Sequence, residues 1–163
     1  MQKISIEKIK KIKLLITDID GVWTDGGLYY DINGQQFLRF SVRDGMGVRL
    51  LREKGIETAI ISGNSTEIVK TRAQKLNIEL VFIGVENKQL ILEQILELRN
   101  LKLEEIAFIG DDVNDLFLFQ NVGISAAPCD AEEEVFKLAH FKCSRKGGYG
   151  AFREFANYIL KYR

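Results

Sequence analysis

Residues 14–26 of the chain read LLITDIDGVWTDG, from Leu14 to Gly26. The apolar run at 12–16 predicts a buried strand, and two carboxylates, Asp18 and Asp20, follow it one residue apart. Because the strand ends here, both side chains can point into the same space, where their negative charges repel each other. A hard, oxygen-seeking cation such as Mg²⁺ would relieve that repulsion. The stretch therefore predicts a metal site at the carboxyl end of a core strand.

Short apolar runs recur along the chain and alternate with helical patterns. The runs predict strands at 12–16, 56–61, 79–83, 106–109 and 122–126. The patterns between them predict helices at 45–54, 65–76, 88–98, 113–119, 132–138 and 151–161. Such alternation is typical of βαβ units. The sequence thus predicts an α/β fold with a doubly wound, Rossmann-like parallel sheet, in a single domain over residues 1–163.

Residues 28–42 break this alternation. Their β-rich arms flank Asn33-Gly34, a pair that favours a tight type I′ turn, so the segment predicts a protruding β-hairpin. An isolated two-stranded ribbon is marginal in water. Its large apolar side chains need a further surface, and they are Leu28, Tyr29, Tyr30, Phe37, Leu38 and Phe40. We expect copies of the hairpin to supply that surface in a homo-oligomer; the alternative is a hairpin folded back on its own domain.

Composition excludes several classes of partner. The chain has 163 residues, 46% of them hydrophobic, which is enough for a real core. Its 23 basic and 23 acidic residues cancel, which argues against binding to nucleic acid or anionic membranes. No apolar run is as long as a bilayer span, and residues 1–6 lack a signal-peptide apolar region. We expect a cytoplasmic protein in which Cys129 and Cys143 are buried or half-buried free thiols.

Polar residues follow four of the predicted strands. Asp18 and Asp20 follow the first, the Ser-Gly-Asn segment 62–64 the second, Lys88 the third, and the segment 110–115, GDDVND, the fourth. In open α/β sheets, ligands bind outside the carboxyl ends of the strands. We therefore expect these four groups to form one site.

In order, spacing and strand placement, the four groups resemble the motifs of haloacid-dehalogenase-type phosphohydrolases. The segments VRDGMG at 42–47 and GGYGAFRE at 147–154 extend the resemblance to 3-deoxy-D-manno-octulosonate 8-phosphate phosphatases and their relatives that act on nine-carbon keto-sugar phosphates. The resemblance covers nearly the whole chain. It implies a Mg²⁺-dependent phosphomonoesterase with no full cap domain, a homotetramer joined through the hairpin, and a role in making cell-surface lipopolysaccharide.

The resemblance also implies a role for each acid. Asp18 would attack phosphorus and form an aspartyl-phosphate, and Asp20 would protonate the leaving oxygen and then activate the hydrolytic water. Mg²⁺ would bind the carboxylates of Asp18 and Asp111 and the backbone carbonyl of Asp20, with Asp115 orienting a bound water or an adjacent side chain. As structural alternatives, the first two acids would be turn or cap residues, and Asp115 would be a surface acid near a helix start.

The remaining groups would hold the phosphate. Ser62 and the Gly63 amide would bind its non-bridging oxygens, and Lys88 would neutralise its charge beside Asp18. Alternatively, Ser62 would only satisfy turn amides, and Lys88 would be an ordinary solvated lysine, although a cation at a helix start opposes the macrodipole.

Asn64 departs from the resembling phosphatases, which usually carry arginine here to bind the acid end of the sugar. As a structural alternative, Asn64 would cap the following helix, with Glu67 three residues on. The missing cation would then come from one of four residues, which are Lys70, Arg72, Arg43 and Arg153. The glycines at 147–150 would either let the backbone approach a ligand, often in a neighbouring subunit of such enzymes, or form a flexible entry to the last helix.

Other functions remain open at this point. One is a sugar phosphatase of different or broad specificity, which Asn64 allows. Another is a receiver-like, non-hydrolytic phospho-acceptor module, but its acceptor should follow a middle strand and lack an acid two residues later. A third is a catalytically silent partner of a sugar-nucleotide enzyme, which the full set of acids together with Lys88 disfavours.

Overall fold

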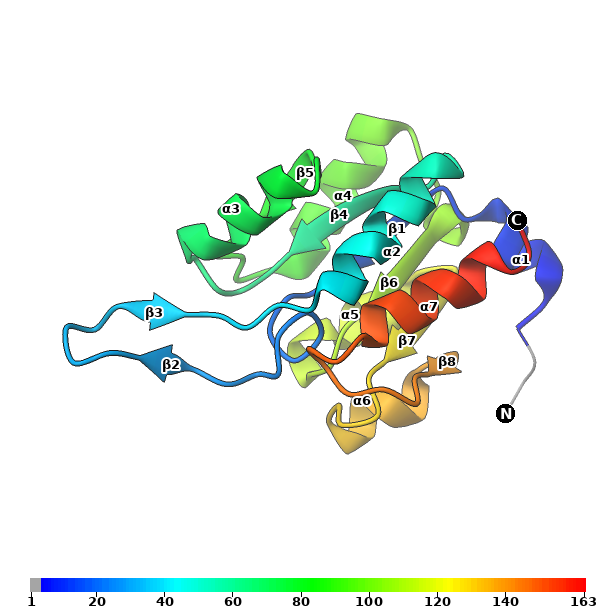
Figure 1. Ribbon diagram of the computed structural model, residues 1–163. Helices are drawn as coiled ribbons and strands as arrows, with labels where there is room; N and C mark the ends of the chain where they lie inside the picture. Colours follow the sequence, from blue (N-terminus) through cyan, green and yellow to red (C-terminus); the bar gives the residue numbers. More distant parts are fainter. Residues whose placement is uncertain (1–3) are drawn as a thin grey trace.

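The central sheet has six parallel strands in the order β5-β4-β1-β6-β7-β8 (Figure 1). The computed structural model describes residues 4–163, so residues 1–3 of the expected domain lie outside the described residues. The strands are β1 (Leu14–Thr17), β4 (Glu57–Ile61), β5 (Leu80–Phe82), β6 (Ile106–Ile109), β7 (Ile124–Ala127) and β8 (Phe141–Lys142). The predicted α/β fold with a parallel sheet is confirmed, and β8 is an additional strand that the sequence did not predict.

Helices cover both faces of the sheet (Figure 1). One face packs against α1 (Ile6–Lys11), α2 (Val42–Glu53), α3 (Glu67–Lys75) and α7 (Ala151–Leu160). The other packs against α4 (Lys88–Arg99), α5 (Leu116–Asn121) and α6 (Glu133–Leu138). Alternation along β1 explains both cores, because Leu15 faces the first layer while Leu14 and Ile16 face the second. The sheet is therefore doubly wound, as predicted.

Helix starts differ from the prediction where side chains cap the backbone. The helix α2 begins at Val42 rather than at 45, because the Ser41 hydroxyl accepts a hydrogen bond from the Arg43 amide. The predicted helix at 113–119 is a 3₁₀ turn, η2 (Val113–Asp115), followed by α5. A second 3₁₀ turn, η1 (Leu103–Glu105), and the helix α1 were not predicted.

The register of β1 brings the candidate site residues to one edge. Thr17 lies opposite Ile60 of β4 on one side and Ile109 of β6 on the other. The residues that follow, Asp18 and the segments 62–64 and 110–115, therefore leave the sheet at similar levels.

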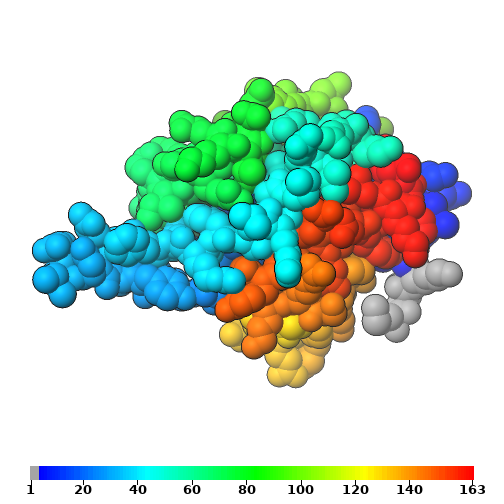
Figure 2. Space-filling model, in the orientation of Figure 1, coloured from blue at the N-terminus to red at the C-terminus, as the bar shows by residue number. Residues whose placement is uncertain are grey.

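The hairpin at 28–42 projects from the body of the domain (Figures 1 and 2). Its strands, β2 (Tyr29–Tyr30) and β3 (Gln36–Phe37), pair antiparallel. The predicted type I′ turn is wrong, because it needs positive φ at both central residues and, outside glycine, the described residues show positive φ only at Asn77 and Asn100. Instead, the Gly34 amide donates to the Asp31 carbonyl, and within this turn only Gly34 takes the left-handed conformation. The Asp31 carboxylate stabilises this turn by accepting from the backbone amides of Asn33 and Gln35.

Most of the hairpin's apolar side chains face solvent in this chain. Exposure is high for Leu28, Tyr29, Tyr30 and Phe37, and Ile32 at the tip is fully exposed. The alternative of a hairpin folded back on its own domain is therefore wrong. Only the residues at its base, Leu38 and Phe40, pack against the core.

The two cysteines differ in exposure. Cys143 is buried, as expected, whereas Cys129 is exposed, so the expectation of two sheltered thiols is wrong for Cys129. Among residues 4–163, no helix combines the length and apolar content that crossing a bilayer requires.

Candidate active site

Three carboxylates converge beyond the carboxyl ends of β1 and β6. Asp18 follows β1, Asp111 follows β6, and Asp115 ends the 3₁₀ turn η2. Each contributes an oxygen, and these oxygens lie within 4.8 Å of one another. Asp18 and Asp115 are buried, so Asp115 is not a surface acid. The convergence that the sequence predicted for these three residues is present.

Lys88 bridges two of these acids. Its Nζ atom donates to Asp18 Oδ2 at 2.5 Å and to Asp115 Oδ1 at 2.6 Å. Lys88 is the first residue of α4, and the Asn87 side chain caps that helix by accepting from the Gln89 amide. Only 3% of the Lys88 side chain is exposed, which excludes the alternative of a solvated surface lysine.

Burial and like charge shift the pKa values of this cluster. Burial raises the pKa of Asp18 to about 6, although Lys88 lowers it. Burial, reinforced by the charges of Asp18 and Asp115, raises the pKa of Asp111 to about 8. The pKa of Lys88 is raised, because the two bonded carboxylates outweigh the effect of its burial. Three acids and one lysine leave an excess of negative charge and of hard oxygen donors, a set that fits Mg²⁺.

Two glycines make room for the carboxylates. A Cβ atom at Gly21 would overlap the Asp111 carboxylate, and one at Gly110 would overlap the Asp115 carboxylate. Gly21 also has a φ of +69°, a conformation that other residues rarely adopt. Asp115 itself accepts a hydrogen bond from the Asp111 amide at 3.1 Å, which fixes the turn between them.

Asp20 is held by two side chains that the sequence did not connect to it. The Asn64 amide nitrogen donates to Asp20 Oδ2 at 3.1 Å, and the Thr24 hydroxyl lies 3.5 Å from Asp20 Oδ1. The alternative of Asn64 as the helix N-cap is wrong, because the N-cap of α3 is Thr66, whose hydroxyl accepts from the Ile68 amide. The Asn64 Oδ1 atom accepts from the Thr66 amide at 3.0 Å, just before the helix, so Asn64 both fixes this turn and joins two segments of the site.

Ser62 and Gly63 lie between β4 and α3. Ser62 is fully buried, and its Oγ accepts from the Asn64 amide at 3.2 Å, so the turn role weighed for it is present. That bond leaves the hydroxyl proton free to donate to a ligand. Gly63 is exposed, and its backbone amide makes no hydrogen bond with the residues that the structure describes.

The four candidate cations have other partners or face solvent. Lys70 pairs with Glu67 at 2.7 Å on the surface of α3, and Arg153 donates to the Asn157 side chain at 2.7 Å. Arg72 donates to the Ser41 carbonyl, and Arg43 is exposed on α2. No hydrogen bond or ion pair among residues 4–163 joins any of them to the acidic cluster.

The glycine segment 147–150 approaches protein backbone. The Gly148 amide donates to the Val22 carbonyl at 2.9 Å, and a Cβ atom at Gly147 would collide with the carbonyl of Gly21. The Gly147 amide donates to the Asp130 carboxylate. The segment is therefore not merely a flexible entry to α7, since its glycines allow close packing on the loop that carries Asp20.

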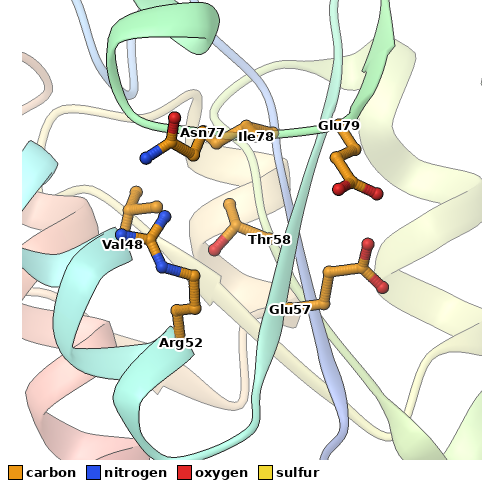
Figure 3. Close-up of a pocket in the computed structure, with 7 residues that line it drawn as sticks. All are labelled: Val48, Arg52, Glu57, Thr58, Asn77, Ile78 and Glu79. Atoms are coloured by element: carbon orange, nitrogen blue, oxygen red, sulfur yellow. The ribbon is translucent and has the colours of Figure 1, made fainter.

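A separate cavity of about 140 Å³ lies at the opposite edge of the sheet (Figure 3). It is lined by Val48, Arg52, Glu57, Thr58, Asn77, Ile78 and Glu79. Glu57 begins β4, so this cavity lies at the amino ends of the strands, away from the acidic cluster. It contains none of the predicted site residues.

Comparisons with known proteins show the family of the chain. The 3-deoxy-D-manno-octulosonate 8-phosphate phosphatase KdsC of Haemophilus influenzae is 39% identical over 155 residues, covering 95% of this chain and 86% of that protein. A family model for haloacid dehalogenase-like hydrolases matches residues 41–123. The chain belongs to this hydrolase family. It is a phosphoric monoester hydrolase, as the resemblance implied.

Solved structures of this hydrolase family share the fold. A crystal structure of the corresponding phosphatase from Yersinia pestis has a TM-score of 0.94 at 36% identity, covering 96% of this chain and 85% of that one. The Moraxella catarrhalis phosphatase, solved with a magnesium ion, a phosphate ion and a KDO molecule, has a TM-score of 0.94 at 33% identity. That match covers 97% of this chain and 91% of the other. The magnesium expected from the sequence agrees with both the three-aspartate cluster and that neighbour.

Proposed function

We propose that this hydrolase removes phosphate from 3-deoxy-D-manno-octulosonate 8-phosphate in a Mg²⁺-dependent reaction. The observation that carries the proposal is the position of Asp18, whose carboxylate is bonded to Lys88 and lies beside Asp111. This arrangement supplies a nucleophile, a cation for the phosphoryl charge and the oxygen ligands of a metal. The relatives named above support this substrate, because they are phosphatases of that sugar phosphate and are similar to this chain over nearly its full length.

Asp18 attacks phosphorus and forms an aspartyl-phosphate, which replaces one difficult displacement by two easier ones. Its ammonium partner, Lys88, keeps the carboxylate oriented and offsets the charge of the incoming phosphate. The Ser62 hydroxyl and the Gly63 amide donate to the non-bridging oxygens. When Mg²⁺ is bound by the carboxylates of Asp18 and Asp111 and the carbonyl of Asp20, it supplies Lewis-acid stabilisation of the phosphoryl charge.

Asp20 carries the proton. It protonates the sugar oxygen as that oxygen leaves, and it then takes a proton from the water that hydrolyses the aspartyl-phosphate. The hydrogen bond from Asn64 and the nearby Thr24 hydroxyl orient its carboxylate for both steps. Asp115 positions Lys88 and the Asp111 backbone.

A phosphatase of different or broader sugar specificity is the second candidate. It is favoured by Asn64, which stands where arginine is usual in the resembling enzymes and which binds Asp20. Under the leading proposal, the substrate carboxylate needs a cation, and Lys70, Arg43 and Arg153 remain candidates. The hairpin is the proposed source of the subunit contacts that would bring such residues together.

We propose a cytoplasmic homotetramer joined through the 28–42 hairpins, in which residues 1–163 form one catalytic domain. The exposed apolar side chains of the hairpin support this assembly, since contiguous apolar surface of this kind marks an interaction site. The product would enter lipopolysaccharide synthesis.

Release of phosphate from a panel of acidic and neutral sugar phosphates, with Mg²⁺ or with EDTA, tests the proposal. We expect Mg²⁺-dependent turnover that prefers the acidic octulosonate ester; equal rates on both classes would favour the broad-specificity candidate. The Asp18→Asn variant should lose turnover and keep its fold, because the change scarcely alters side-chain volume. A long-lived phosphorylated protein with negligible turnover would favour the receiver-like alternative.

A further inference from the structure

The loop that carries Asp20 is packed against the glycine segment 147–150. The Gly148 amide donates to the Val22 carbonyl at 2.9 Å, and a Cβ atom at Gly148 would collide with the backbone of Thr24 and Asp25. Because these contacts join backbone to backbone, a shift of Gly148 moves the loop that begins at Asp20.

A hairpin residue binds the carbonyl group of the same glycine. The Arg39 guanidinium donates to the Gly148 carbonyl at 2.9 Å, and its Cζ atom lies 4.1 Å from the centre of the Tyr149 ring. Arg39 comes two residues after β3, at the base of the hairpin. Gly148 therefore links the hairpin to the catalytic loop through its own amide and carbonyl groups.

The second arm of the hairpin reaches the same loop. The Tyr29 hydroxyl donates to Asp25 Oδ2 at 2.7 Å, and this bond lowers the pKa of Asp25. Both arms thus bind the segment that follows Asp20, one directly and one through Gly148. A change in the hairpin has a short physical route to the acid/base.

Further hydrogen bonds hold Gly147 and the residues on both sides of the glycine segment. Asp130 accepts from the Gly147 amide, Asp44 accepts from the Arg153 amide, and Glu154 accepts from the backbone amides of Ser144 and Arg145. These bonds hold the segment when the Arg39 contact is removed. Loss of Arg39 should therefore shift the position of Gly148 without unfolding the segment.

We infer that Arg39 is a positioning residue, which fixes the Asp20 loop through Gly148 and couples the hairpin to proton transfer. The inference rests on the proposed role of Asp20 as the general acid. The hairpin then does more than join subunits, because its seating sets how well Asp20 is aligned with the leaving oxygen. A misplacement of 1 Å can cost about 100-fold in rate, so a smaller shift is expected to cost about tenfold.

The dependence on leaving group tests this role. A sugar alkoxide needs a proton from Asp20, whereas 4-nitrophenolate leaves without one, and kcat/KM reports the phosphorylation step for both esters. For Arg39→Met we expect kcat/KM to fall about tenfold with the sugar phosphate and less than about twofold with 4-nitrophenyl phosphate. The variant Arg39→Lys, which keeps a cationic donor, should recover most of the loss. Arg49→Met, which removes an exposed arginine of α2, is the matched control.

Two further measurements separate the explanations. The solution mass of Arg39→Met should equal that of the parent protein, and its melting temperature should fall by only the few degrees that one lost hydrogen bond costs, so that neither loss of assembly nor unfolding is the cause. Equal losses on both esters, or none on either, would overturn the inference. The Asp20→Asn variant distinguishes a failure of the Arg39 inference from a failure of the general-acid role of Asp20. If Asp20→Asn loses more activity with the sugar phosphate than with 4-nitrophenyl phosphate and Arg39→Met does not, the inference about Arg39 fails and the proposed function stands. If Asp20→Asn shows no such dependence, the general-acid proposal itself fails.

Discussion

Replacing Lys88 by methionine should destabilise the metal-free protein by about 3–5 kcal/mol at pH 8, the usual cost of removing one partner from a buried ion pair. The Lys88 side chain is 3% exposed, and its two bonded acids, Asp18 and Asp115, are 8% and 0% exposed. Methionine fills much of the same volume but leaves both carboxylates without a counter-charge. For a domain of this length, roughly 2–4 °C of melting temperature correspond to each kcal/mol, so the expected shift is about 6–20 °C.

The pH dependence gives this prediction a definite sign. Burial raises the pKa of Asp18 to about 6 in the folded parent protein, and removal of Lys88 raises it further. An acid whose folded pKa is raised destabilises the fold increasingly as pH rises from its unfolded pKa of about 4 to its folded pKa. Without Lys88 the folded pKa of Asp18 lies above 6, so the variant should recover part of its stability as pH falls toward 6 and this buried acid becomes neutral. The difference from the parent should be largest above pH 8.

Thermal unfolding in EDTA between pH 5.5 and 8.5 checks this expectation. Lys70→Met is the control, because Lys70 pairs with Glu67 on the surface and such pairs contribute about 0.5 kcal/mol or less. A melting shift of less than 2 °C for Lys88→Met at pH 8, or one that grows as pH falls, would refute the role given to this buried lysine.

Three other predictions concern separate parts of the molecule. Burial and the neighbouring carboxylates raise the pKa of Asp111 to about 8, so Mg²⁺ binding at pH 7 should release about one proton, and the Mg²⁺ affinity should rise with pH up to about 8. Calorimetry in buffers of different ionisation enthalpy measures the proton release, and an affinity independent of pH would contradict the prediction. A thiol reagent should label exposed Cys129 in the folded protein, and it should label Cys143, which is buried and whose pKa is raised by burial, only after unfolding. Mass spectrometry of the labelled protein checks this, and labelling of Cys143 before Cys129 would contradict it. Replacing exposed Ile32 and Phe37 by glutamate should reduce the solution mass, and an unchanged mass would remove the hairpin from the interface.

The sheet and the acidic cluster could be predicted because they depend on local patterns and one topological rule. Apolar runs marked the five longer strands, and parallel strands carry their following loops to one edge, which placed Asp18 near Asp111. The two-residue strand β8 was missed because so short a segment carries no periodic signal.

Side-chain contacts between distant segments could not be predicted. Asn64 and Asp20 are 44 residues apart, and a capping pattern gave Asn64 a sufficient local explanation. Gly147 and Gly148 are required by the nearby backbone at 21–25, a requirement that exists only in the folded chain. The hairpin turn was mispredicted because the Asp31 side chain stabilises a longer loop than Asn33-Gly34 suggests.

A crystal structure of the protein with Mg²⁺ and beryllium fluoride, a mimic of the phosphoryl group, tests the central claim most directly. We predict that beryllium is bonded to an Asp18 oxygen, with Lys88 and Ser62 donating to the fluorides and Mg²⁺ bound by Asp18, Asp111 and the Asp20 carbonyl. Beryllium fluoride on another side chain, or Mg²⁺ bound away from Asp18 and Asp111, would contradict the account.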